Sequence, residues 1–210
     1  DVAGRAADKS PEVVAVAKQF GAEYFDGDRK YGYGGYRYDR RWRPVAENII
    51  NHYGLAHGGR VLDVGCAKGF LVSEFDRDQN DYGLQIDAYG LDVSRYAIVE
   101  QPHLPIVGRL HLGSADDLPF PDKSFDLVLS INTLHNLPRP RLIKALQEMR
   151  RVSRGDMFVQ VDSYRTAAEK ALFEDWVLTA ETHCYPEDWH ALFIEAGYDG
   201  DYCWTYVEAG

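Results

Sequence analysis

The chain has 210 residues, a formal net charge of -10 and a composition that is 45% hydrophobic. This composition excludes a disordered chain, a collagen and a coiled-coil rod, and the length favours one large domain with a buried core. No apolar run reaches the roughly 18 residues of a membrane helix, and no signal peptide opens the sequence. Because an acidic chain is poorly suited to nucleic acid, we expect a soluble protein with a small-molecule partner and neither membrane nor nucleic acid.

The cysteines are three in number and far apart, at Cys66, Cys184 and Cys203. An odd and widely spaced set matches neither a disulfide framework nor a zinc site. This pattern predicts a cytoplasmic protein with reduced thiols and no metal.

The N-terminal part begins with a helix signal, because Ser10 can cap a helix that has Pro11 at its first position. An apolar stripe then continues to Gly21. A second helix is expected over residues 44–53, closed by Gly54. Residues 27–43 between them follow neither a helical nor a strand pattern.

From Arg60 onward, short apolar runs alternate with helical stretches. The predicted strands are residues 60–64, 88–91, 110–112, 125–131, 157–161 and 202–207. The predicted helices are residues 70–76, 95–100, 140–152, 167–182 and 186–196. This alternation predicts an α/β fold, with a mostly parallel sheet covered by helices on both faces. Ligands of such sheets bind beyond the carboxyl ends of the strands.

A glycine turn follows the first predicted strand, in Asp63-Val64-Gly65-Cys66-Ala67-Lys68-Gly69. A dinucleotide fingerprint would need glycine at positions 67 and 70, and a P-loop would need Ser or Thr after Gly-Lys, so both readings fail. The carboxylate of Asp63 would repel a pyrophosphate but suits a cationic ligand. An ordinary strand-to-helix connection is the alternative.

An acid, Asp92, follows the second predicted strand 23 residues after Gly69 (92 − 69). A carboxylate at this place suits hydrogen bonds to ribose hydroxyls. The alternative is that Asp92 caps the helix that starts near Ser94.

Three segments in order, VLDVGCAKG, YGLDVS and GSADDLPFPDKSFDLVLSINTLHNL, make the chain resemble a class I S-adenosylmethionine-dependent methyltransferase. The resemblance is strong over residues 59–137 and looser over 141–207, and Ala67 departs from the family's middle glycine. It implies a three-layer Rossmann-like methyltransferase fold over residues 56–210. It also implies S-adenosylmethionine as cofactor, S-adenosylhomocysteine as product, and no metal.

The resemblance further implies how the cofactor is held. Asp63 would face the methionine amino group, Asp92 the ribose and Val93 the adenine. The turn, with Gly65, Cys66, Ala67 and Gly69, would pack on the amino-acid and ribose portion. The adenine edge would meet the loop of Ser114, Ala115 and Asp116, where Ser114 replaces the family's usual acid, and Asn132 would lie beside the sulfonium.

The acceptor side is less defined. His135 lies at the mouth of the fourth strand and is a candidate general base, although a structural role is an equal reading. Asp162, Tyr164, His183 and Tyr185 are expected to face the site from later loops. Asn132 is not followed by Pro-Pro, which argues against N-methylation of adenine or cytosine.

The segment 29–43 is rich in aromatic residues, glycine and arginine. Residues 26–43 contain six basic and three acidic side chains, so this part of an otherwise acidic chain carries a net positive charge. We expect residues 1–55 to form N-terminal helices and a lid that closes over the site, with a plain basic loop as the alternative. The lid residues expected to contact substrate are Tyr31, Tyr33, Tyr36, Arg37, Tyr38 and Trp42.

The resulting expectation is an enzyme that transfers a methyl group to an O, N or C atom of a small polar or anionic metabolite, for instance in natural-product or sugar tailoring. The alternatives are a methyltransferase of RNA or protein, a non-catalytic cofactor-binding module and, less favoured, a nicotinamide oxidoreductase. The family usually ends its sheet with two antiparallel strands, whereas only one clear strand, 202–207, is visible here. An unpaired edge makes a homodimer possible.

Overall fold

A computed structural model describes residues 2–75, 83–99 and 109–207. They form a six-stranded sheet in the order β3-β2-β1-β4-β5-β6, in which every pair of neighbours is parallel. The strands are β1 (Arg60–Val64), β2 (Asp87–Asp92), β3 (Leu110–Leu112), β4 (Phe125–Ile131), β5 (Ser153–Ser163) and β6 (Asp201–Tyr206). The chain order reverses between β1 and β4, which is where a ligand site is expected.

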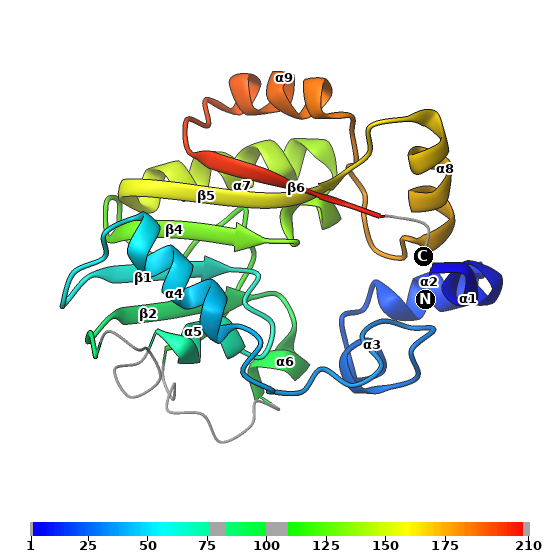
Figure 1. The fold of residues 1–210 in the computed structure, drawn as a ribbon, viewed down its shortest axis with the longest axis horizontal. Helices are drawn as coiled ribbons and strands as arrows, with labels where there is room; N and C mark the ends of the chain where they lie inside the picture. Colours follow the sequence, from blue (N-terminus) through cyan, green and yellow to red (C-terminus); the bar gives the residue numbers. More distant parts are fainter. Residues whose placement is uncertain (1, 76–82, 100–108, 208–210) are drawn as a thin grey trace.

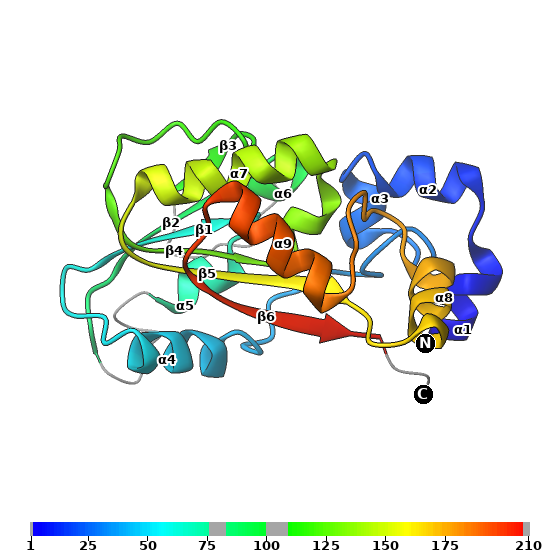
Figure 2. The same cartoon turned by 90° about the horizontal axis from the view of Figure 1, so that it is seen from above.

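Helices cover both faces of the sheet, so the domain has three layers (Figures 1 and 2). α4 (Arg43–His52) and α5 (Phe70–Glu74) pack on one face, while α7 (Arg139–Val152) and α9 (Pro186–Ala196) pack on the other. The remaining helices are α1 (Val2–Asp8), α2 (Pro11–Ala17), α3 (Ala22–Asp26), α6 (Arg95–Val99) and α8 (Ala167–Trp176), with a short 3-10 turn, η1, at Leu134–Asn136. Figure 1 shows α1, α2, α3 and α8 beyond the carboxyl ends of the strands.

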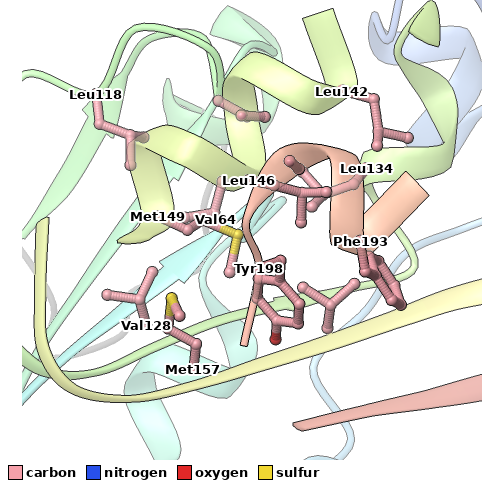
Figure 3. Packing of buried hydrophobic residues seen from close by; sticks show 14 of the residues in the cluster. Val64, Leu118, Val128, Leu134, Leu142, Leu146, Met149, Met157, Phe193 and Tyr198 are labelled. Atoms are coloured by element: carbon pink, nitrogen blue, oxygen red, sulfur yellow. The ribbon is translucent and has the colours of Figure 1, made fainter. Parts of the chain in front are cut away.

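The larger core lies between the sheet and the α7 and α9 layer (Figure 3). α7 places Leu142, Leu146 and Met149 on one face, at helical spacing, and all three are fully buried. Burial of each such side chain stabilises the fold by about 2 kcal/mol. A second core holds α4 against the opposite face through Ala46, Ile49 and Ile50. α4 precedes the domain boundary predicted at residue 55, yet it covers the sheet.

The strand predictions are confirmed at all six positions, with β5 extended at both ends. The helix prediction for residues 167–182 is wrong beyond Trp176, because Val177 takes an extended conformation. Beyond that point, the backbone N–H groups of Glu181 and Thr182 donate to the carbonyl of His135. These tertiary hydrogen bonds replace helical ones. α1 and α3 were not predicted, and Asp76 and Glu100, the expected ends of two helices, lie outside the described residues.

The end of the sheet differs from the two antiparallel strands implied by the resemblance. β6 pairs directly with β5 in parallel, from Phe158 opposite Asp201 to Ser163 opposite Tyr206. Within the described ranges no antiparallel strand follows it. The single closing strand predicted from the sequence is confirmed, and the antiparallel pair is wrong for this part of the chain.

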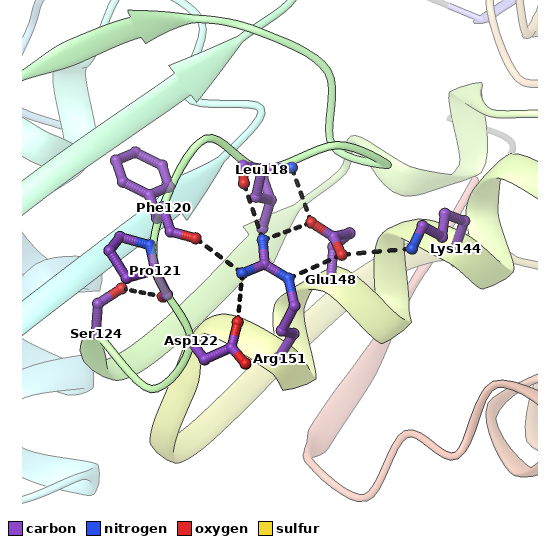
Figure 4. A network of polar contacts seen from close by, with 8 residues as sticks. All are labelled: Leu118, Phe120, Pro121, Asp122, Ser124, Lys144, Glu148 and Arg151. Carbon is purple, nitrogen blue, oxygen red and sulfur yellow. Dashed lines mark hydrogen bonds and ion pairs between the residues drawn. The ribbon is translucent and has the colours of Figure 1, made fainter.

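The loop between β3 and β4 is fastened to α7 by a polar network (Figure 4). The Arg151 guanidinium donates to Glu148 Oε2 at 2.7 Å and to the carbonyl oxygens of Leu118 and Phe120. Glu148 Oε2 also accepts from the backbone N–H of Leu118 at 3.0 Å. Hydrogen bonds from Arg151, helped by that N–H, lower the pKa of Glu148 to about 2. The network fixes the loop that begins at Gly113.

We expect Glu148→Gln to lower the free energy of unfolding at pH 7 by about 2 kcal/mol, since it leaves Arg151 without its buried carboxylate. The folded-state pKa lies below the unfolded one, so the wild-type stabilisation is present above about pH 4.5 and is lost as the pH falls through about 2. Urea unfolding from pH 7 to 2 measures this. The exposed Glu187→Gln is the matched control, and equal stability of both variants would contradict the assignment.

No helix in the described part of the chain is both long and apolar enough to cross a membrane.

Candidate functional site

A cavity of about 450 Å³ opens at the carboxyl ends of the strands, where the chain order reverses. One wall comes from the loops after β1, β2 and β3, with Gly65, Ala67, Asp92, Val93 and residues 113–115. A second wall comes from residues 132–133 and 136–138 after β4. Aromatic side chains in and around α3 complete the lining: Phe20, Tyr24, Phe25 and Tyr33. The cavity therefore brings residues of the three predicted cofactor motifs together with the loop after β4 and the N-terminal segment.

The turn after β1 is held in a left-handed backbone conformation at Gly65 (φ 87°), Ala67 (φ 50°) and Gly69 (φ 75°). The backbone N–H groups of Gly65 and Cys66 donate to the carbonyl of Leu91 at the end of β2. A Cβ on Gly65 would lie 2.2 Å from side-chain atoms of Thr133. Glycine is therefore required at position 65 both by conformation and by the approach of the loop after β4.

Asp92 joins two of the loops. One carboxylate oxygen accepts from the backbone N–H of Ala67 at 2.8 Å, and the other accepts from the N–H of Ser94 at 2.7 Å. The bond to Ser94 matches the capping alternative, while the bond to Ala67 ties the acid to the glycine turn. Burial raises the pKa of Asp92. Each oxygen keeps a lone pair for a ligand hydroxyl.

Asp63 is buried, at 5% exposure, near the end of β1. Burial, together with the charge of Asp92, raises the pKa of Asp63 to about 8. Among the described residues, no cation pairs with this carboxylate and no side chain donates to it. A buried carboxylate in this state is stabilised by an arriving cation.

The other predicted cofactor residues divide into two groups. Val93, Ser114, Ala115 and Asn132 line the cavity, and Val93 is 60% exposed although it is apolar. Asp63, Cys66 and Gly69 belong to the strand end and the turn but are not in the lining.

Asp116 is directed elsewhere. Its carboxylate accepts two hydrogen bonds from Arg141, at 2.6 and 2.9 Å, and one from Ser114. These bonds, Arg141 first, hold the pKa of Asp116 well below its usual value. The structure therefore brings Ser114 to the cavity and ties Asp116 to α7.

His135 is buried and is not part of the cavity lining. Its Nδ1 accepts from the backbone N–H of Asp162 at 3.3 Å, and its Nε2 lies 3.5 Å from Asp162 Oδ2. Burial lowers the pKa of His135. Because both ring nitrogens face Asp162, neither is directed at an acceptor, and this geometry corresponds to the structural alternative rather than to a general base.

The remaining acceptor candidates pack around the ends of β5 and α8. Tyr164 is buried against Phe173, and its hydroxyl contacts His183 at 3.2 Å. Its ring makes an edge contact with Tyr185. None of Asp162, Tyr164, His183 and Tyr185 lines the cavity.

The predicted lid residues take different positions. Tyr33 lines the cavity, whereas Tyr36 stacks on Phe70 with ring centres 4.7 Å apart, and Tyr38 meets the same ring edge-on. Tyr31 packs beside Val13 and Leu178, Trp42 packs on the α4 core, and Arg37 is exposed.

Several cavity residues were missed by sequence reasoning. They are aromatic or polar residues from the segment after α2, from α3 and from the loop after α8: Lys18, Gln19, Phe20, Tyr24, Phe25, Thr179 and Glu181. The sequence pattern before Gly21 predicts only an apolar stripe, and residues 177–182 fall within a predicted helix. Thr179 is buried next to Tyr24, whose hydroxyl hydrogen bonds with it.

The sequence model of a family described as a methyltransferase domain matches residues 62–159, from within β1 to within β5. This match supports assignment of the chain to the class I S-adenosylmethionine-dependent methyltransferases. The cofactor of this family is S-adenosylmethionine.

Individual proteins agree with this assignment. The chain is 36% identical over 111 residues to a fatty-acid O-methyltransferase of Mycolicibacterium smegmatis, which covers 50% of the chain and 38% of the relative. It is 30% identical over 162 residues to a demethylmenaquinone methyltransferase of Geobacillus kaustophilus, covering 74% and 64%. The chain thus spans less than two thirds of these relatives.

A structure of a complex between the Haloferax volcanii Trm112 methyltransferase activator and a methyltransferase contains a chain of the same fold. The TM-score is 0.59 at 24% identity, and the match covers 76% of this chain and 68% of that one. In the described part of the chain, no group of three or more His, Cys, Asp or Glu side chains is arranged to hold a metal.

Proposed function

We propose that this chain transfers a methyl group from S-adenosylmethionine to an O, N or C atom of a small polar molecule. The observation that carries the proposal is that one continuous cavity joins Asp92 and Val93 to the loop after β4 and to the N-terminal segment. A cofactor and an acceptor would share this space.

The residues present fit the cofactor. Asp92 offers two carboxylate oxygens for the ribose hydroxyls, and the exposed apolar Val93 suits the face of the adenine. The buried carboxylate of Asp63 lacks a cation among the described residues and would suit the methionine ammonium. Ser114 and Ala115 would meet the adenine edge, and Asn132 would lie near the sulfonium.

The charges of the cavity wall favour a polar, uncharged acceptor over an anionic one. Lys18 forms an ion pair with Glu181, and Arg141 forms one with Asp116. Both cations among the described lining residues are therefore already paired. The rest of the acceptor side offers hydroxyl and amide groups, from Tyr24, Tyr33, Thr179 and Asn136.

Methyl transfer requires little chemical participation from the protein side chains. The cofactor supplies an activated methyl group, and the protein holds the acceptor in line with it and excludes water. The aromatic cover of Phe20, Tyr24 and Tyr33 would exclude water, and no general base is assigned to His135. The curated relatives are named for a fatty acid and for demethylmenaquinone, which supports a small-molecule acceptor.

The test is turnover. The protein is incubated with methyl-labelled S-adenosylmethionine and, separately, with a small-molecule extract, total RNA or denatured protein, and S-adenosylhomocysteine is quantified. We expect product formation only with the small molecules. Product formed only with RNA or protein would favour a macromolecular methyltransferase, and absence of product with every pool would favour a binding module.

Asp63 gives a second expected result. Because its pKa is about 8 in the free protein, it is mostly protonated at pH 7, and an ammonium bound beside it would release about one proton. Calorimetric titration with S-adenosylhomocysteine at pH 7, in buffers of different ionisation enthalpy, should show this release. It should vanish at pH 9 and in Asp63→Asn. A binding enthalpy that is independent of the buffer at pH 7 would exclude the contact.

A further inference from the structure

The glycine turn of the proposed cofactor site is bonded to the N-terminal segment. Lys68, in the middle of the turn, has a side chain only 7% exposed, and its ammonium forms an ion pair with Asp26 at the end of α3. The same carboxylate oxygen accepts from the Tyr96 hydroxyl of α6 at 2.7 Å. Its other oxygen accepts from the backbone N–H of Tyr36 at 3.2 Å.

Asp26 therefore connects three separate parts of the chain: the turn after β1, the helix after β2 and the segment 29–43. Although partial burial acts to raise it, hydrogen bonds from Lys68 and Tyr96 bring the pKa of Asp26 below its usual value. The carboxylate is thus ionised at neutral pH and paired with a cation that has almost no contact with water.

A second contact joins the same two regions. The Ser94 hydroxyl donates to the carbonyl of Phe20, just before α3, while Ser94 also donates its backbone N–H to Asp92. Between the two contacts, Phe25 packs on Ala67 and Ala97. Both loops that hold Ala67 and Asp92 therefore contact the segment that covers the cavity.

We propose that Asp26 and Lys68 form a latch that couples closure of the N-terminal segment to binding of the cofactor. The proposal rests on the proposed function, because it takes the turn of Gly65 to Gly69 as part of the cofactor site. While Lys68 is paired with Asp26, the turn has the conformation that we expect to bind the cofactor. In this closed arrangement the N-terminal segment also covers the cavity with Phe20, Tyr24 and Tyr33. By linkage, a bound cofactor stabilises the closed segment to the same extent.

The latch is tested with Asp26→Asn and Lys68→Met, which remove one charge each at nearly constant size. The matched control is Asp28→Asn, because among the described residues Asp28 Oδ1 accepts only from the nearby backbone N–H of Lys30. We expect each latch variant to bind S-adenosylhomocysteine about 10-fold more weakly, within the usual range of such couplings, with faster dissociation. The control should bind as the wild type does.

Hydrogen exchange of residues 20–43 measures how often the N-terminal segment opens, both without ligand and with S-adenosylhomocysteine. Exchange should be faster in both latch variants, and S-adenosylhomocysteine should slow it strongly in the wild type but weakly in the variants. The double variant should bind about as weakly as either single variant, because the two residues act as a pair.

Two outcomes overturn the proposal in different ways. If folded Asp26→Asn and Lys68→Met bind S-adenosylhomocysteine within twofold of the wild type, the latch is wrong and the proposed function stands. If the wild type does not bind S-adenosylhomocysteine, both are wrong. Circular dichroism of each variant establishes that it is folded.

Discussion

Asp92→Ala is expected to weaken binding of S-adenosylhomocysteine by at least about 100-fold. The ribose would lose hydrogen bonds to an ionised group, worth about 1.5–3 kcal/mol each, and each tenfold in affinity corresponds to about 1.4 kcal/mol. The turn would also lose its anchor, because Asp92 Oδ2 accepts from the N–H of Ala67. Calorimetric titration measures the affinity.

The matched control is Asp117→Ala, which removes one acid from the exposed surface of the loop after β3. It should leave the affinity within about twofold, since an exposed charge is screened by solvent. The melting temperature of each variant separates lost binding from lost folding. A folded Asp92→Ala protein that bound S-adenosylhomocysteine as tightly as the wild type would show that Asp92 only caps α6.

Gly65→Ala is expected to lower the free energy of unfolding by about 3 kcal/mol. A left-handed conformation costs an alanine about 1–2 kcal/mol, and forcing a methyl group into packed surroundings costs about 1–3 kcal/mol more. The new Cβ would lie 2.2 Å from Thr133, so the loops after β1 and β4 would have to separate. Urea unfolding measures the change.

Gly54→Ala isolates the conformational part of this cost. Gly54 also has a positive φ, of 58°, but a Cβ there would meet no atom within 4 Å. We expect a loss of about 1 kcal/mol from strain alone. If Gly65→Ala were no more destabilising than Gly54→Ala, the close approach of Thr133 would play no part in the need for glycine.

The strands β1 to β4 could be predicted from the sequence because each is a short apolar run bounded by turn residues, as in Arg60–Val64 and Phe125–Ile131. The direct pairing of β6 with β5 could not be predicted, since an apolar run does not identify its neighbour in the sheet. The early end of α8 was also missed. It depends on hydrogen bonds from Glu181 and Thr182 to His135, which is distant in sequence.

The site shows the same division. The glycine turn after β1 could be predicted, and Gly65 and Gly69 take left-handed conformations within it. The directions of the side chains could not be predicted, because they depend on partners from other elements. His135 is turned toward Asp162, and Asp116 is turned toward Arg141. Tyr24 and Thr179 reach the cavity through the packing of α3 against the loop after α8, which no local pattern reports.

The cavity at the ends of β1, β2 and β4 is expected to bind the cofactor of a methyltransferase. The most direct measurement is calorimetric titration of the wild-type protein with S-adenosylhomocysteine and, in parallel, with NAD. We expect one S-adenosylhomocysteine bound per chain, no heat with NAD, and loss of binding in Asp92→Ala. No binding of S-adenosylhomocysteine, or saturable binding of NAD at the same site, would contradict it.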